Sequence, residues 1–382
     1  MPFGISAAKP ARGQDLTEIT RALTDGVLAA RAYCESCLAR IRASEATIRA
    51  WAALDPERAL AIAATRDVRH AQGGEKGALH GVPVGVKDIF DTGDLPTEMG
   101  SPAFVGNRPG KNAELVERVV AAGGYSLGKT ATTEFAFMHP AETRNPWDPR
   151  HTPGGSSSGS AAAVAAGHVP VAIGTQTNGS VIRPAAFCGV VGFKPTPDTL
   201  PVQGALPFAE TLDQAGVFTR TVADAAYFAA CVADPGTFAA EVEALSRPPR
   251  VAFLQRYPWN AAEPDAAAHL KAALSRLADA GTEVKGIDLP DDFEDAQRVH
   301  RTIMLYEGAR EHAPRQAVHG RVMSAELNAA IDQGLAMSHD DYRGALARRA
   351  VLAELALDLF EDCDAIASLP APGAAPGRLD VT

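Results

Sequence analysis

The sequence GGSSSGSAAAVAAGHVPVAIGTQTNGSVIRP, residues 154–184, carries most of the structural information in this chain. Two glycine-rich loops hold Ser156 and Ser180, and an alanine-rich run followed by an apolar run separates them. Alanine is the strongest helix former, so residues 160–166 predict a helix. The apolar run 169–173 predicts a buried strand. The segment therefore predicts a helix followed by a strand, with one loop serine on each side of this unit.

The same alternation of helices and strands continues on both sides of this segment. Helical patterns cover residues 15–51, 56–73, 113–122 and 265–280 and most of 293–362, and strand patterns cover 82–86, 125–128, 251–254 and 283–289, with a loop at 370–376. Alternating elements of this kind predict an α/β fold with a largely parallel sheet covered by helices.

Composition excludes several classes of function. The chain has 382 residues and a net charge of −10, from 46 acidic and 36 basic residues. An acidic protein without a basic cluster is not expected to bind nucleic acid or anionic membranes. Residues 1–15 lack the apolar core of a signal peptide, and no apolar stretch is long enough to span a bilayer. The 5 cysteines are scattered, which is typical of a reducing compartment, so we expect a cytoplasmic protein.

A single lysine follows the apolar strand pattern at residues 82–86. Lys87 ends this run, and burial of a lysine lowers its pKa from about 10.4 toward neutrality. A neutral lysine can remove a proton from a serine, which is a poor nucleophile until it is deprotonated. Histidine is the usual base, but the downstream candidates lie in predicted helical segments: His269, His300, His312, His319 and His339. Lys87, Ser156 and Ser180 are therefore the candidate proton relay.

Three local patterns suggest other chemistry, and each lacks the context it needs. Residues 123–130 match the phosphate-binding pattern GxxxxGK[ST], but a helix precedes them and a strand lies inside the supposed loop. Residues 155–159 match the GxSxG nucleophile pattern without a suitable downstream histidine. Cys34 and Cys37 have CxxC spacing inside a helical pattern, with no second pair, so we interpret them as plain helix thiols.

Four blocks follow one family pattern in order. These are LHGVPVGVKDIFDTGDLPTEMGSPAF (79–104), LGKTATTEFA (127–136), TRNPWDPRHTPGGSSSGSAAAVAAG (143–167) and VIRPAAFCGVVGFKPT (181–196). The chain resembles the amidase signature family of Ser–Ser–Lys amide hydrolases. The resemblance implies the amidase signature fold, a central mixed and largely parallel twisted sheet with helices on both faces. It implies one domain over 1–382, with a helical segment at 15–75, a catalytic core at 76–235 and a strand-and-helix region at 250–382.

The family mechanism assigns a role to each member of the relay. Lys87 takes a proton from Ser156, Ser156 takes one from Ser180, and Ser180 attacks the amide carbonyl to form an acyl-enzyme. The bridging serine of the family is held by a cis peptide. The expected oxyanion hole is formed by backbone N–H groups of Thr177, Asn178, Gly179 and Ser180. Thr175, Ser157 and Arg183 are expected to contact substrate. No metal or organic cofactor is expected.

The second loop departs from the commonest family pattern, GTDTGGSxR. Gln176 replaces the acidic residue, Asn178 replaces a glycine, and the arginine is displaced by one position to Arg183. Asparagine tolerates left-handed backbone better than other non-glycine residues, so the turn is expected to survive. Arg183 either binds a substrate carboxylate as a bidentate partner or forms a structural ion pair. The first alternative predicts a small amide that carries an acid group, such as a malonamate-like molecule.

The end of the chain is the second departure, because family members usually continue for several more elements after a segment like 365–376. We expect a hydrolase that cleaves a C–N amide bond in a small molecule and releases a carboxylic acid with ammonia or an amine. Two alternatives stay open: the amidase-like subunit of a glutamine-dependent tRNA amidotransferase, and an inactive truncated homologue. The expected partner is a small-molecule amide, and a homodimer is left open.

Overall fold

Residues 15–238, 246–256 and 262–381 are described in a computed structural model of the chain. Their packing divides the chain into two compact units: Met1–Val242, Val318–Leu327 and Ala375–Thr382 form unit 1, and Glu243–Ala317 and Asn328–Ala374 form unit 2. The single domain over 1–382 stays a prediction. The prediction that no signal peptide is present falls on residues 1–14, which lie outside the described residues, and on Asp15.

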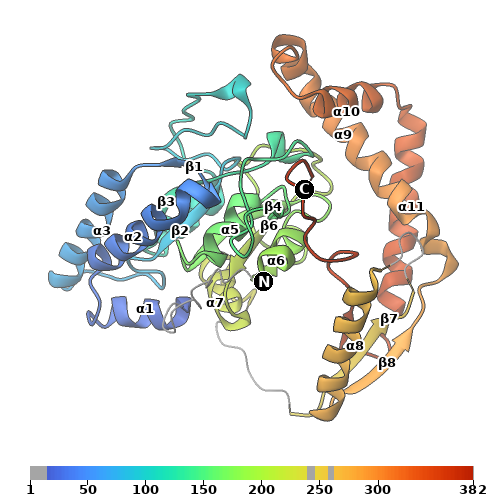
Figure 1. The fold of residues 1–382 in the computed structure, drawn as a ribbon, viewed down its shortest axis with the longest axis horizontal. Helices are drawn as coiled ribbons and strands as arrows, with labels where there is room; N and C mark the ends of the chain where they lie inside the picture. The colour runs from blue at the N-terminus through green and yellow to red at the C-terminus, as the bar shows by residue number, and fades with distance from the viewer. Residues whose placement is uncertain (1–14, 239–245, 257–261, 382) are drawn as a thin grey trace, which may run out of the picture. The chain divides into compact units, whose positions relative to one another are not determined.

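Unit 1 is built on a mixed six-stranded sheet. Its strands are Trp51–Leu54 (β1), Pro83–Lys87 (β2), Tyr125–Thr130 (β3), Val171–Gln176 (β4), Val191–Phe193 (β5) and Gln214–Thr219 (β6). They lie in the order β1-β3-β2-β4-β6-β5 (Figure 1). The central strands β3, β2 and β4 are parallel, whereas β1, β6 and β5 pair antiparallel with their neighbours. β2 and β3 are buried along their whole length, as expected for parallel strands between layers of helices.

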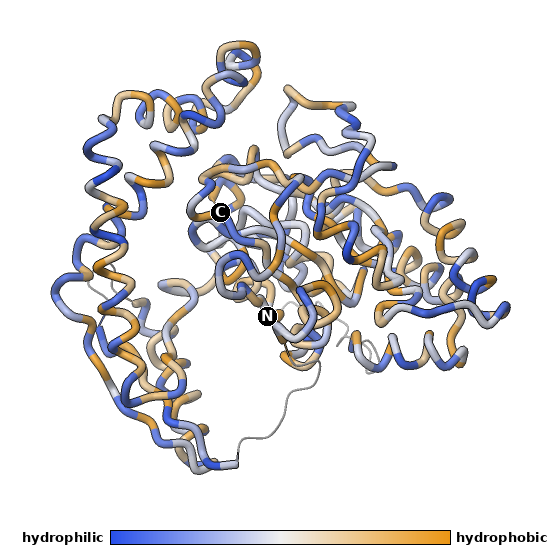
Figure 2. Tube along the Cα trace, turned by 180° about the vertical axis from the view of Figure 1, so that it is seen from behind, coloured by the Kyte–Doolittle hydropathy of each residue, from blue (hydrophilic) through white to orange (hydrophobic). Residues whose placement is uncertain are grey.

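Helices flank this sheet. They are Leu16–Thr24 (α1), Ala30–Ile48 (α2), Pro56–Ala71 (α3), Glu114–Ala121 (α4), Ser158–Ala165 (α5), Ile182–Cys188 (α6) and Val222–Val232 (α7), with short 3₁₀ turns at Pro102–Phe104 (η1) and Glu134–Ala136 (η2). α5 packs on β2, β3, β4 and β6, α3 and α4 pack on β3, and α7 packs on β5 and β6. Helices α1 and α3 carry both hydrophobic and hydrophilic residues along their length (Figure 2). Within the described residues, no helix is both long enough and apolar enough to cross a bilayer.

A glycine in helix α5 lets the helix approach the backbone next to strands β1 and β3. A Cβ atom on Gly159 would lie 2.2 Å from the carbonyl oxygen of Ala50 and 2.3 Å from the amide nitrogen of Ala131. Residues 158–164 of this helix are all buried. The loop before α5, which carries Ser156, is therefore fixed in the core of unit 1, next to the buried end of β2.

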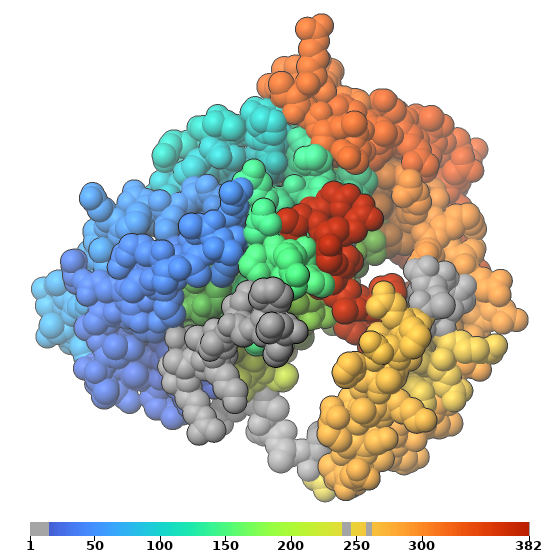
Figure 3. All heavy atoms as spheres, in the orientation of Figure 1, coloured from blue at the N-terminus to red at the C-terminus, as the bar shows by residue number. Residues whose placement is uncertain are grey.

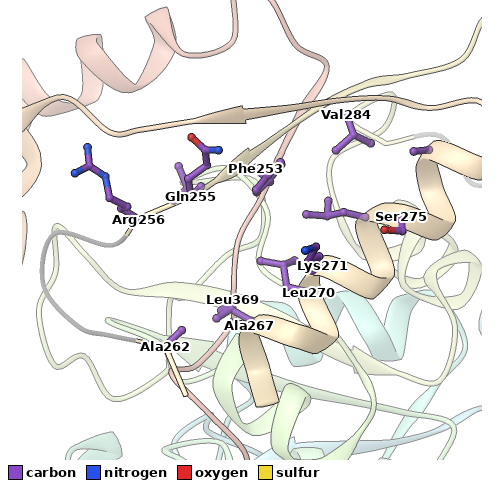
Figure 4. Close-up of a pocket in the computed structure, with 13 residues that line it drawn as sticks. Phe253, Gln255, Arg256, Ala262, Ala267, Leu270, Lys271, Ser275, Val284 and Leu369 are labelled. Carbon is purple, nitrogen blue, oxygen red and sulfur yellow. The ribbon is translucent and has the colours of Figure 1, made fainter. Parts of the chain in front are cut away.

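Beyond residue 246 a second, smaller sheet forms. The elements are Arg250–Leu254 (β7), Pro264–Asp279 (α8), Glu283–Ile287 (β8), Asp291–Asp295 (η3), Ala296–His319 (α9), Ala325–Leu335 (α10), His339–Asp358 (α11) and Ala365–Ala367 (β9). The sheet has the order β8-β7-β9 and is parallel throughout. An apolar cavity of about 650 Å³ lies between β7, β8 and α8, with Phe253, Leu270 and Val284 among its lining residues (Figure 4).

The predicted α/β fold is confirmed, and most elements lie within a few residues of their predicted positions. The prediction that residues 15–51 are helical throughout is wrong in two places. The chain breaks between α1 and α2, where Gly26 has a φ of 72°, and residue 51 begins strand β1. A short apolar run such as Trp51–Leu54 does not distinguish strand from helix by periodicity alone. Strands β5 and β6 and helices α6 and α7 were not predicted from the sequence.

Candidate active site

Lys87 lies at the carboxyl end of β2 and is fully buried. Its Nζ atom lies 2.7 Å from the Ser156 Oγ atom and 2.8 Å from the Thr175 Oγ1 atom. Burial lowers the pKa of Lys87 to about 7, and the nearby Asp213 carboxylate opposes this by raising it. A pKa near neutrality leaves part of the Lys87 population neutral at physiological pH, and the neutral form can accept a proton from Ser156.

The loop before α5 places Ser156 beside this lysine. The peptide bond between Gly155 and Ser156 is cis. Gly154 has a φ of 76°, and its backbone approaches Pro184 so closely that a Cβ atom would lie 3.0 Å from the Pro184 Cα atom. The Ser158 hydroxyl donates a hydrogen bond of 2.7 Å to the Gly154 carbonyl. The loop is thus fixed from both sides, by α6 and by its own helix.

Ser157 and Thr175 connect the first loop to strand β4. The Ser157 hydroxyl donates to the Thr175 carbonyl at 3.1 Å and accepts from the Thr175 N–H at 3.4 Å. Ser157 is fully buried, whereas Thr175 lines a cavity. Substrate contacts for both residues stay predictions. What these bonds do is hold the Ser156 loop against the strand that leads to Ser180.

The loop that carries Ser180 runs from the end of β4 to the start of α6. The Gln176 Oε1 atom accepts hydrogen bonds from the N–H groups of Val181 (2.9 Å) and Ile182 (3.0 Å). The side-chain oxygen of Gln176 thus accepts hydrogen bonds from two backbone N–H groups at the start of α6. Asn178 was expected in left-handed backbone, but within the described chain its φ is not positive. The turn closes through the Gln176 side chain, so it does not need that conformation.

Ser180 is 7% exposed and stands at the end of this loop. In the described part of the chain, its hydroxyl makes no hydrogen bond with Ser156. The structure therefore forms the Lys87–Ser156 link of the predicted relay and leaves the Ser156–Ser180 link open. Such bonds are often long without a substrate and shorten when one binds.

A cavity of about 70 Å³ lies at the end of β4 in unit 1. Its lining is mostly apolar, and the polar residues in it are Thr175, Thr177, Glu210 and Asp213. The loop predicted to form the oxyanion hole therefore borders a small cavity that two acids, Glu210 and Asp213, also line. Within the described residues, no cluster of three or more His, Cys, Asp or Glu side chains is arranged to hold a metal ion.

Asp213 belongs to this site but was not predicted from the sequence. Its Oδ1 atom accepts a hydrogen bond from the Thr177 hydroxyl, and its Oδ2 atom accepts from the N–H groups of Phe208 (2.6 Å) and Ala209 (3.1 Å). The available signal was an acidic residue immediately before an apolar strand pattern, in TLDQAGVFT at 211–219. Asp213 immediately precedes β6, which pairs with β4 beside Thr175 and Thr177. This position makes it a candidate site residue.

Arg183 lies between the two serine loops. Its Nη2 atom donates a hydrogen bond of 2.8 Å to the Gly155 carbonyl, and its buried Nε atom has no hydrogen-bond partner among the described residues. Among the described residues, no carboxylate forms an ion pair with Arg183, so the described part of the chain gives the structural ion-pair interpretation no support. Burial lowers the pKa of this guanidinium. Arg183 is a partly buried cation with unused hydrogen-bonding capacity.

The C-terminal residues contact the loop that precedes Ser156. The Thr152 hydroxyl donates to the Val381 carbonyl (2.9 Å) and accepts from the Gly154 N–H (3.1 Å). The Thr152 N–H donates to the Pro376 carbonyl at 3.1 Å, and the His151 ring lies 2.7 Å from the Ala375 carbonyl oxygen. In Figure 3 the C-terminal segment (red) lies against the green segment that contains this loop. Thr152 therefore links the end of the chain to the glycine-rich loop.

The competing patterns do not form sites. Strand β3 runs through the phosphate-binding pattern, and Lys129 within it is buried and ion-paired with Asp88 at 3.2 Å. Cys34 and Cys37 are buried in α2, and burial raises the pKa of both thiols. The five histidines considered as bases all lie in helices, namely α8, α9 and α11.

Three comparisons place the chain among known proteins. The sequence model described as Amidase matches residues 32–381. The A subunit of glutamyl-tRNA(Gln) amidotransferase from Chloroflexus aurantiacus is 46% identical over 207 residues, which are 53% of this chain and 42% of that relative. The chain thus aligns with less than half the length of such curated relatives.

Solved structures are similar over most of the chain. A structure described as an amidase is 32% identical with a TM-score of 0.86, and the match covers 92% of this chain and 81% of that one. The peptide amidase of Stenotrophomonas maltophilia is 29% identical with a TM-score of 0.76, and the match covers 90% and 80%. Similarity therefore extends across the elements that hold Lys87, Ser156 and Ser180.

Proposed function

We propose that this chain, which belongs to the amidase family, hydrolyses the C–N bond of a small-molecule amide. The observation that carries this proposal is the contact between a buried lysine and the loop serine. The Lys87 Nζ atom lies 2.7 Å from the Ser156 Oγ atom, and burial lowers the pKa of Lys87 to about 7. A buried base of this kind replaces the histidine of other serine hydrolases.

The reaction begins with two proton transfers. Neutral Lys87 accepts the Ser156 hydroxyl proton while Ser156 accepts the Ser180 proton, and the Ser180 oxygen attacks the amide carbonyl carbon. The proton then returns through Ser156 to the departing nitrogen, which leaves as ammonia or an amine. Water attacks the resulting ester on Ser180 by the same relay and releases the carboxylic acid. The Thr175 hydroxyl, 2.8 Å from the Lys87 Nζ atom, orients the lysine for both steps.

Free backbone amides support an oxyanion hole in the Ser180 loop. The N–H groups of Val181 and Ile182 are occupied by Gln176. Among the described hydrogen bonds, none uses the N–H groups of Asn178, Gly179 or Ser180. Oriented amides without partners stabilise the oxyanion of a tetrahedral intermediate, and losing one such donor slows the reaction about 10²- to 10³-fold.

The finer proposal concerns the substrate. Arg183 is a partly buried cation without a carboxylate partner among the described residues, and it donates to Gly155, the residue before Ser156. A guanidinium in this state binds a carboxylate strongly because it has already lost part of its hydration. We propose a small amide that carries an acid group, of the malonamate type.

The second candidate is the amidase-like subunit of a glutamine-dependent tRNA amidotransferase. The observation in its favour is the 46% identity with the glutamyl-tRNA(Gln) amidotransferase relative from Chloroflexus aurantiacus. This function needs partner proteins, so stable co-purification with other subunits and glutamine-dependent ammonia release would support it. A cytoplasmic location and a homodimer stay predictions.

Covalent labelling tests the proposed nucleophile and separates an active enzyme from an inactive homologue. A fluorophosphonate probe should label the protein once, and Ser180→Ala should abolish labelling. Ser156→Ala should slow labelling by about 10²- to 10⁴-fold, because it removes the proton-transfer bridge. Ser126→Ala is the matched control, since the buried Ser126 hydroxyl has no hydrogen-bond partner in the part of the chain that the structure describes. A folded wild-type protein that does not label would contradict the proposal.

A further inference from the structure

Strand pairing places Asp213 opposite the proposed oxyanion loop. β4 and β6 are antiparallel, with Gln176 opposite Gln214 and Thr175 opposite Ala215. Asp213 precedes the paired residue on β6, and Thr177 follows the paired residue on β4. In antiparallel strands such residues face each other, so this register brings the Asp213 carboxylate to the Thr177 hydroxyl.

The hydrogen bonds of the carboxylate join it to fixed groups of the site. One oxygen accepts from Thr177, and the other accepts from the N–H groups of Phe208 and Ala209. A carboxylate with hydrogen bonds on both oxygens has a fixed orientation. The loop that leads to Ser180 is consequently anchored to the start of β6.

The same carboxylate is linked to Lys87 through Thr175. The Lys87 Nζ atom lies 2.8 Å from the Thr175 Oγ1 atom, and Thr175 and Asp213 line the same cavity. The Asp213 charge raises the pKa of Lys87, and the Lys87 charge lowers that of Asp213. The other acid at this cavity is Glu210, which is exposed and therefore screened by water. When Lys87 accepts a proton, positive charge develops in a buried place, and a fixed carboxylate nearby stabilises that charge. The acid of a Ser-His-Asp triad acts on its imidazolium in this way.

We propose that Asp213 is a positioning residue of the active site, which anchors the Thr177–Ser180 loop and stabilises the protonated form of Lys87. This inference rests on the proposed function of Lys87 and Ser180. Asp213 would support the three relay residues without contacting the substrate. It would act on Lys87 by electrostatic attraction and on the Ser180 loop through Thr177.

The test is the rate of fluorophosphonate labelling as a function of pH. In wild type the rate should rise through a midpoint set by Lys87. Asp213→Asn keeps the shape, and its amide can donate to the Thr177 oxygen and accept from Phe208 and Ala209. Without the negative charge, the midpoint should move to lower pH by about one unit. The plateau rate should fall as well, because the lysine becomes a weaker base.

Two further variants separate charge from anchoring. Thr177→Val removes the anchor but keeps the carboxylate, so it should lower the rate at every pH and leave the midpoint in place. Glu210→Gln removes an exposed acid of the same cavity and should not move the midpoint. If Asp213→Asn does not fold, as judged by circular dichroism, Asp213→Ser gives the same readout.

The outcomes distinguish this inference from the function on which it rests. Wild-type protein that does not label contradicts the proposed function itself. Labelling at Ser180 with the same midpoint in wild type and in a folded Asp213→Asn variant overturns the role of Asp213. An equal midpoint shift in Glu210→Gln also overturns it, because any acid at the cavity would then act alike.

Discussion

The Nζ atom of Lys87 lies 2.7 Å from the Oγ atom of Ser156, although 69 positions separate the two residues in the sequence. The contact forms because β2 ends in the core of unit 1, where the loop before α5 also begins. Neither side chain is more than 2% exposed. A lysine in such a place is a base at neutral pH, and this sets the pH dependence of both activity and stability.

Activity should rise with pH through about 7. The pKa of Lys87 is lowered to about 7 by burial, and only the neutral amine accepts the proton of Ser156. Below the pKa, kcat/KM should fall about tenfold per pH unit, and above it the profile should level off. Lys87→Arg, which stays protonated, should be inactive throughout. A wild-type midpoint near 10, the value of an exposed lysine, would contradict this assignment.

Stability should also rise with pH, for the same reason. Between about 7, the pKa of Lys87 in the folded protein, and 10.5, its ordinary value, the unfolded chain binds a proton that the folded chain does not. The free energy of unfolding therefore increases with pH across this window. Lys87→Met should lack that contribution. Urea denaturation at several pH values should show wild type gaining stability relative to Lys87→Met as pH rises, whereas parallel curves would show that Lys87 is not perturbed.

Arg183→Met should discriminate between substrates. The variant keeps side-chain length and removes the charge, so turnover of carboxylate-bearing amides should fall about 10- to 100-fold more than that of neutral amides, mainly through KM. The ratio is the informative quantity, because loss of the hydrogen bond to Gly155 affects both substrates. Arg183→Lys, which keeps the charge without the planar fork, should lie between. An equal loss on both substrates would leave Arg183 with no part in recognition.

Lys129→Met should destabilise the fold by about 3–5 kcal/mol, since it leaves the buried Asp88 carboxylate without its cation. The pair is almost completely buried, with side chains 0% and 2% exposed and a separation of 3.2 Å. The double variant Lys129→Met/Asp88→Asn removes both charges and should recover much of the loss. Chemical denaturation measures all three proteins. A double variant no more stable than Lys129→Met would show that the charge on Asp88 is not the cause.

Thr152→Val should weaken the connection between the C-terminal residues and the glycine-rich loop. It removes the hydroxyl that bonds both Gly154 and Val381, at a cost of about 1 kcal/mol in the free energy of unfolding. Because Gly154 precedes the Ser156 loop, the labelling rate of Ser180 should fall as well. Thr152→Ser retains the hydroxyl and should behave as wild type. If valine and serine variants label at the same rate, the link does not support the site.

The elements that could be predicted from the sequence are those that depend on the pattern of neighbouring residues. Apolar runs ending at Lys87 and the alanine-rich run after Ser156 predict β2 and α5, because helix and strand periodicity are local properties. The three relay residues could be named because they stand at the ends of these elements. Strand β6 and Asp213 were missed, since an antiparallel pairing with β4 over 30 residues away is a property of the folded sheet.

The departures in the Ser180 loop show the same limit. The sequence identified Gln176 as unusual, but only the folded loop shows its side chain accepting two amides at the start of α6. Similarly, the sequence left Arg183 with two interpretations. Which of them holds depends on whether a carboxylate lies nearby, and this is a fact of tertiary packing that no local pattern contains.

The bond from Thr152 to Val381 spans 229 positions, and this affects how the protein is made. A ribosome that adds about 5–20 residues per second needs about 10 to 45 seconds to travel that far. Once Ser180 has been added, early in that interval, the nascent chain holds Lys87, Ser156 and Ser180, but the loop beside Ser156 still lacks its contact with Val381. The groups of the proposed relay are therefore synthesised well before the segment that contacts the loop beside Ser156.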